Sequence, residues 1–164
     1  METAMSSEVA EIGPRGIGGW LLLAIIGLAM TSLLVLGNVV VDLRDIGAAG
    51  WGAFYEASPA LASFSAVTSA SGVIVVAYAI YCLWLIFSFD PRVPRAMTAF
   101  YLAMAVVVTL KAVGLLYFSN SLGDPGLVDN EPRDAIRAWL TCAIWIPYFR
   151  VSKRVANTFA REAG

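Results

Sequence analysis

The chain has 164 residues, of which 59% are hydrophobic and 14% charged, with a net charge of −1 and a mean hydropathy of +0.75. Soluble domains carry about 25% charged residues, and a domain of this size buries only about 70% of the surface that its unfolded chain exposes. The composition therefore excludes an ordinary soluble domain and indicates that lipid surrounds much of the chain. We expect no nucleic-acid partner.

Residue types that carry chemistry are scarce. The chain has no histidine, which removes histidine metal sites, histidine bases and histidine pH switches. Cys82 and Cys142 lie in apolar runs without metal-ligand spacing, so we interpret them as small buried hydrophobic residues. The sequence also lacks a phosphate-binding glycine loop and a nucleophile elbow. We therefore expect no cofactor, no metal and no enzymatic activity.

Apolar runs recur four times along the chain and predict an all-α, polytopic membrane protein. A spanning helix needs about 20 mostly apolar residues. The first run carries no charge and is too long for a cleaved signal peptide. The predicted spans, within a transmembrane domain over residues 16–149, are 17–41, 60–89, 96–118 and 134–149.

The segments between the spans have their own signals. Residues 1–15 predict an acidic cytoplasmic tail, and residues 42–58 predict a loop with aromatic residues at headgroup level. Ser58 and Pro59 are typical of an N-cap and the first position of a helix. The second span then begins with small residues that suit close helix packing in lipid. These small residues are Ala62, Ser65, Ala66, Ser69, Ala70 and Gly72.

In the second half of the chain, prolines and charged residues mark the segments between and after the predicted spans. A basic turn over residues 90–95 precedes the third span, and an acidic loop over 119–133 follows it. Pro147, near the inner end of the fourth span, predicts a bend there. Residues 150–164 predict a basic amphipathic cytoplasmic tail that continues the fourth helix past this bend.

The distribution of Lys and Arg predicts the orientation. Seven basic residues fall on the side of the termini and the 90–95 turn, namely Arg15, Arg92, Arg95, Arg150, Lys153, Arg154 and Arg161. Only Arg44 and Arg133 fall in the opposite loops, with Arg137 just inside the fourth span. The positive-inside rule therefore predicts that both termini face the cytoplasm.

Short motifs along nearly the whole chain resemble a bacterial family, the YdgK-like inner-membrane proteins of unknown function. They are residues 16–23 (GIGGWLLL), 93–95 (VPR), 110–112 (LKA), 146–150 (IPYFR) and 152–159 (SKRVANTF). The last motif is distinctive, whereas glycines before a membrane helix are common. The resemblance implies four helices in the bacterial inner membrane and no established activity.

One lysine lies inside a predicted span. Lys111 is seven positions from the outer end of the third span, so about 10 Å deep, and an intramembrane charge is a candidate functional residue. We predict an outer-leaflet polar cluster of Lys111, Arg137, Thr141, Asn38, Asp42 and Asp134. It would suit a small anion or an anionic lipid. Alternatively, Lys111 reaches the outer headgroups by itself or pairs with Asp42 or Asp134.

The basic tail predicts contact with the membrane surface. Val151, Val155 and Phe159 recur every four residues among cations. This pattern is typical of a short helix on an anionic inner leaflet, although an ordinary positive-inside anchor gives the same pattern. The residues predicted to contact anionic inner-leaflet lipids are Arg150, Lys153, Arg154 and Arg161.

The sequence leaves three classes of function open. A structural or accessory membrane protein, with a membrane-protein partner or as a homo-oligomer, is our main expectation because of the small-residue face. A small transporter, or an anion- or lipid-binding subunit using the cluster around Lys111 and Arg137, is the alternative. A lipid-modifying enzyme has few acid–base candidates.

Overall fold

The computed structural model describes residues 16–128 and 130–159, and every regular element in these ranges is helical. Four helices are long: α1 (Trp20–Ala49), α3 (Pro59–Phe87), α4 (Val93–Leu122) and α5 (Glu131–Val151). Short helices connect or follow them: α2 (Trp51–Ala57), the 3₁₀ turn η1 (Pro125–Leu127) and α6 (Lys153–Thr158). The predicted tail over residues 1–15 and Arg161 lie outside the described residues.

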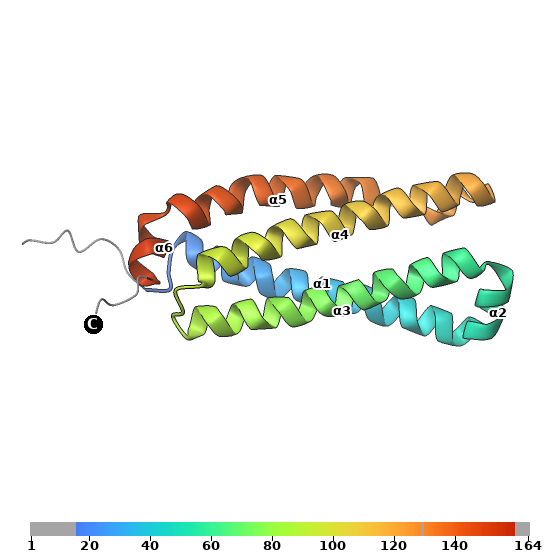
Figure 1. Ribbon diagram of the computed structural model, residues 1–164, viewed down its shortest axis with the longest axis horizontal. Coiled ribbons are helices and arrows are strands. Elements are labelled where there is room, and N and C mark those ends of the chain that lie inside the picture. Colours follow the sequence, from blue (N-terminus) through green and yellow to red (C-terminus); the bar gives the residue numbers. More distant parts are fainter. Residues whose placement is uncertain (1–15, 129, 160–164) are drawn as a thin grey trace, which may run out of the picture.

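The long helices form two antiparallel hairpins (Figure 1). One consists of α1 and α3 joined by α2, and the other of α4 and α5 joined by η1. Contacts between α3 and α4 connect the hairpins. In Figure 1, α2 and the α4–α5 connection lie at one end of the molecule, and α6 lies at the other end beside the start of α1. We call these the α2 end and the α6 end.

Three of the long helices have the length and composition to cross a membrane. They are Trp20–Arg44 of α1, Pro59–Phe87 and Val93–Leu122. At most 33% of the most apolar window of each is buried inside the molecule, so most of their side chains face outward. Exposed apolar helices of this length are those of a membrane protein.

The helix α5 differs from these three in its charges. It has 21 residues, about 31 Å at 1.5 Å per residue. Acidic Glu131 and Asp134 lie in its first turn and Arg150 in its last. The apolar stretch between Arg137 and Arg150 is therefore only about 18 Å long, shorter than a bilayer core of about 30 Å.

Small residues on α3 allow it to approach α1 closely. Ala62, Ser69 and Gly72 are buried, whereas Ala66 and Ala70 are exposed. A side chain on Gly72 would begin 2.7 Å from Val39 Cγ2 of α1, which is closer than real side chains approach. The predicted packing role of the small residues therefore holds for one face of α3, where a glycine lets the helices meet.

Helix ends follow local backbone rules. The helix α3 begins at Pro59 after Ser58 as predicted, although the Ser58 hydroxyl makes no capping bond. The helix α4 ends at Gly123 in the left-handed conformation (φ 67°), and Gly123 and Asp124 both donate to the Ser119 carbonyl. Glycine is the residue that adopts this conformation without a steric penalty.

Two predicted boundaries need correction. The loop predicted over 42–58 is mostly helical, because α1 continues to Ala49 and α2 follows directly. The tail predicted to continue the fourth helix is instead a separate helix, since α5 runs through Pro147 and ends at Val151. The break is at Ser152, whose backbone is extended (ψ 117°) and whose hydroxyl accepts from the Val155 amide over 3.4 Å. Serine at an N-cap is a common way to start a new helix.

The short helix α6 packs against the turn between α3 and α4 and against the residues before α1. Val155 and Phe159 are buried in the hydrophobic core, and the Phe159 ring lies 6.5 Å from Phe89 in the α3–α4 turn. Thr158 Oγ1 accepts a hydrogen bond from the Gly16 amide over 3.0 Å. The apolar side of the tail therefore contacts protein, which corrects the prediction that Val155 and Phe159 face lipid. Only Val151 of the predicted stripe is exposed.

Candidate functional site

The helices α4 and α5 pack against each other over most of their length, and side chains fix their alignment. In the middle of α4, Trp139 Nε1 donates to Thr109 Oγ1 over 3.0 Å. Closer to the α6 end, Tyr101 stacks on Trp145 with ring planes 9° apart. Cys142 Sγ donates to the Tyr101 carbonyl over 3.1 Å. These contacts set the depth at which the charged residues of the two helices lie.

The aromatic residues of the long helices include both exposed and buried side chains. Trp20, Trp84 and Trp139 are exposed, as an interface position requires. Phe100 and Tyr101 are instead buried, and Tyr78 of α3 stacks on Phe100. Phe100 and Tyr101 therefore connect α3 to α5 through α4.

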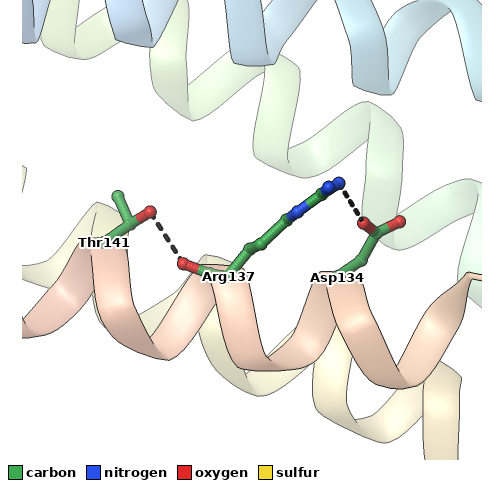
Figure 2. A network of polar contacts seen from close by, with 3 residues as sticks. All are labelled: Asp134, Arg137 and Thr141. Atoms are coloured by element: carbon green, nitrogen blue, oxygen red, sulfur yellow. Dashed lines mark hydrogen bonds and ion pairs between the residues drawn. The ribbon is translucent and has the colours of Figure 1, made fainter.

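Three residues of the predicted polar cluster interact on α5 (Figure 2). Arg137 Nη1 lies 3.3 Å from Asp134 Oδ1, and the Arg137 side chain extends along the helix toward this carboxylate. The Thr141 hydroxyl donates to the Arg137 carbonyl over 2.8 Å. The charged side chains are 69% and 53% exposed, so the ion pair contributes at most about 1 kcal/mol in water. Thr141 is bonded within its own helix.

The other members of the predicted cluster lie on α4 and α1. Lys111 is half-buried on α4 and makes no hydrogen bond or ion pair within the described residues. Lys111 follows Thr109 by two residues on α4, and Arg137 precedes Trp139 by two residues on α5. Because the helices are antiparallel, the two cations lie at the same depth.

Asn38 is exposed and Asp42 half-buried on α1, which packs mainly against α3 and α2. Within the described residues neither makes a hydrogen bond or ion pair with Lys111 or with the α5 group. Of the predicted cluster, Asp134, Arg137 and Thr141 therefore interact with one another. Lys111 lies at the same depth as Arg137 but makes no hydrogen bond or ion pair with these residues.

Hydroxyl groups inside the long helices are mostly bonded to their own helix. Ser32, Ser71 and Thr98 each donate to a backbone carbonyl three or four residues earlier. Ser63, Thr68 and Thr109 do the same. Ser69 is an exception, with a buried oxygen that has no hydrogen-bond partner in the described structure. No group of three or more Cys, Asp or Glu residues within the described ranges is placed to hold a metal ion.

The basic residues of the tail have different environments. Arg150 and Lys153 are exposed, whereas Arg154 is half-buried. The Arg154 guanidinium lies over the loop before α1, where a side chain on Gly18 would begin 3.0 Å from Arg154 Nη1. The spacing of Val151, Val155 and Phe159 predicted a basic amphipathic segment, but nothing in that spacing showed that Arg154 faces the start of α1.

The fold and these polar groups define a small, all-helical membrane protein whose charged side chains gather toward the helix ends. The chain belongs to the DUF2569 family, described as a protein of unknown function, whose model matches residues 14–160. No curated protein and no solved structure matches the chain.

Proposed function

We propose that the chain crosses the bacterial inner membrane four times, with both termini in the cytoplasm, and acts as a structural or accessory protein. In this proposal it works through helix–helix and lipid contacts and catalyses no reaction. The resemblance to YdgK-like proteins supports the bacterial inner membrane, and the distribution of Lys and Arg supports the orientation.

The exposed surface of α1 is the observation that carries this proposal. Only Leu21, Ala24, Leu28 and Val39 of its described side chains are buried. Its contacts within the chain are mainly with α3 and α2. Large apolar residues make up most of the remaining surface, and Leu33 and Leu34 are 64% and 65% exposed. Such a helix offers lipid or a second membrane helix a long apolar face.

The hydroxyl bonds described above support a role without catalysis. A nucleophile or a general acid must be free to reach a substrate, and the serine and threonine groups named there, except Ser69, donate within their own helix. Asp134 lies in the first turn of α5, where its negative charge complements the positive end of the helix dipole, and the exposed Arg137 side chain pairs with it.

A fourth crossing by α5 is supported by its alignment with α4. The contacts from Trp139 to Tyr101 bring α5 along the middle of α4. The apolar core of α5 is short, but long Arg side chains at both of its ends can extend to the headgroups. Arg137 and Arg150 are both exposed and placed for this.

A second candidate function, binding of a small anion or an anionic lipid at the outer leaflet, rests on Lys111. This half-buried cation has no carboxylate partner among the described residues and lies at the depth of Arg137. The Arg137–Asp134 pair lowers the net positive charge at this level, so we rank this function second.

Photo-crosslinking in native membranes tests the main proposal. A photoreactive residue replaces Leu34 on α1 in the tagged full-length chain, and the control carries it at Ile74 on α3, which is 68% exposed. We expect Leu34 to give a discrete protein adduct, either a partner or a second copy, that Ile74 does not give. Adducts with lipid alone at Leu34 would contradict a role through helix contacts.

A further inference from the structure

A groove opens between the start of α1 and the end of α5. It has a volume of about 560 Å³, and Trp20, Trp145, Pro147, Tyr148, Val151 and Ser152 are among its lining residues. Small-molecule sites have volumes of about 300–1,000 Å³ and mostly apolar walls. The groove exists because α5 continues past Pro147 and α6 then turns back at Ser152, so Trp20 faces the last turn of α5.

The groove lies where a helix enters the membrane. Trp20 is the first residue of a candidate spanning segment, and Trp145 and Tyr148 lie on the opposite wall. Tryptophan and tyrosine are enriched at the level of lipid headgroups, where an apolar ring meets a polar surface. A molecule in this groove would therefore have its polar part at the membrane surface and its apolar part among the lipid chains.

A cation lies close to the groove, beside the loop that precedes the lining residue Trp20. Arg154 follows the lining residue Ser152 by two positions, and its guanidinium lies over Gly18 and Gly19, directly before Trp20. Arg154 is half-buried and makes no ion pair within the described residues. The exposed cations Lys153 and Arg150 lie nearby in the chain. Apolar walls with a cation beside them complement a molecule that has an apolar chain and an anionic group.

We propose that this groove holds an acyl chain of an anionic phospholipid from the cytoplasmic leaflet, and that Arg154 binds its phosphate. Arginine suits this role because its planar guanidinium forms paired, charge-assisted hydrogen bonds with phosphate oxygens. The inference depends on the proposed function in one respect, because the proposed orientation places the groove in the cytoplasmic leaflet. Labelling of the two ends of α5 from opposite sides of the membrane decides that orientation separately.

The test is native mass spectrometry of the full-length protein in mild detergent. Phosphatidylglycerol and phosphatidylcholine with identical acyl chains are titrated separately. We expect preferential binding of phosphatidylglycerol, and Arg154→Gln should weaken it about tenfold, the effect of losing a charge-assisted contact. The matched control Lys153→Gln removes the same charge from the adjacent exposed position and should change binding less than about twofold.

A second pair of variants tests the groove itself. Val151→Trp places a large ring in the groove, and Ile136→Trp makes the same change at an exposed position near the α2 end of α5. Val151→Trp should reduce phosphatidylglycerol binding, and Ile136→Trp should not. Arg154→Lys keeps the charge but loses the paired bonds, so its phosphatidylglycerol binding should lie between those of the wild type and Arg154→Gln.

Three outcomes would overturn the proposal. Equal losses in Arg154→Gln and Lys153→Gln would mean that general surface charge attracts the lipid. Unchanged binding in Arg154→Gln would mean that Arg154 does not bind the phosphate. Unchanged binding in Val151→Trp would place the lipid elsewhere.

Discussion

Trp139 of α5 donates its indole N–H to the hydroxyl of Thr109 on α4 over 3.0 Å, and this bond fixes the alignment of the two helices. Thr109 at the same time donates to the Ala105 carbonyl of its own helix. The hydroxyl is thus both acceptor and donor, and the bond brings Lys111 and Arg137 to the same depth. Bonds of this kind contribute about 0.6 kcal/mol on average in membrane proteins, and up to about 1.7.

The first prediction is that Thr109→Val and Trp139→Phe destabilise the chain in a coupled way. Each change removes the interhelical bond, so the double variant should cost less than the sum of the single variants. We expect a coupling energy of about 0.6–1.7 kcal/mol from a double-mutant cycle of unfolding in detergent. Thr98→Val is the control, because the Thr98 hydroxyl bonds only to Pro94 of its own helix. Additive effects would show that the bond does not align the helices.

The second prediction concerns the close approach of α1 and α3. Gly72→Ala adds a methyl group 2.7 Å from Val39 Cγ2 and should lower the unfolding free energy by about 1–3 kcal/mol, as overpacking does. Val39→Ala should rescue part of this loss. Gly37→Ala on α1 is the control, since nothing lies within 4 Å of its added methyl group. Equal melting temperatures for Gly72→Ala and Gly37→Ala would show that the helices do not pack through Gly72.

The sequence was sufficient to predict the helical class, the long helices and the proline starts, because apolar runs and Pro59 act locally. The loop over 42–58 was mispredicted because charge ended the apolar run while the backbone remained helical to Ala49. Helix hydrogen bonds do not require apolar side chains, so the edge of a span and the end of a helix differ.

The candidate site was less predictable, because its partners lie far apart in the chain. The Asp134–Arg137 pair is local and follows from a three-residue spacing. The contact of Arg154 with Gly18 and Gly19 joins the two ends of the chain, and no periodicity reports such a contact. The stripe of Val151, Val155 and Phe159 was also ambiguous, since a core and a lipid surface select the same apolar residues.

The third prediction separates these two readings of the stripe. Val155 is 1% exposed and Val151 is 80% exposed, so substitution by alanine should lower the unfolding free energy by different amounts at the two positions. Val155→Ala should lower the unfolding free energy by about 1.5–3 kcal/mol, from lost burial and a cavity. Val151→Ala should change it by less than about 0.5 kcal/mol. Backbone amide hydrogen exchange over residues 153–158 should become faster in Val155→Ala and should stay unchanged in Val151→Ala. Similar behaviour of the two variants would mean that α6 does not dock on the bundle.

The fourth prediction concerns Lys111. If it serves only to reach the outer headgroups, Lys111→Arg should melt near wild type, because both side chains can extend to the interface. Lys111→Leu should also insert and melt near wild type, because removing the charge saves up to about 3 kcal/mol of insertion cost. A pairing with Asp42 would instead make Lys111→Leu destabilising and Asp42→Asn restorative. We expect the first result in thermal unfolding. Selective loss of a bound anionic lipid in Lys111→Leu, with melting intact, would favour the second candidate function.

The central claim is that α5 crosses the membrane and places α6 in the cytoplasm, and labelling of single cysteines at its two ends tests it most directly. In a background without Cys82 and Cys142, Ser121→Cys precedes α5 and Ala156→Cys lies on α6, both at exposed positions. A membrane-impermeant maleimide should label Ser121→Cys in spheroplasts and Ala156→Cys only after permeabilisation. Labelling of both from the same side would show that α5 does not cross and would contradict the four-span arrangement.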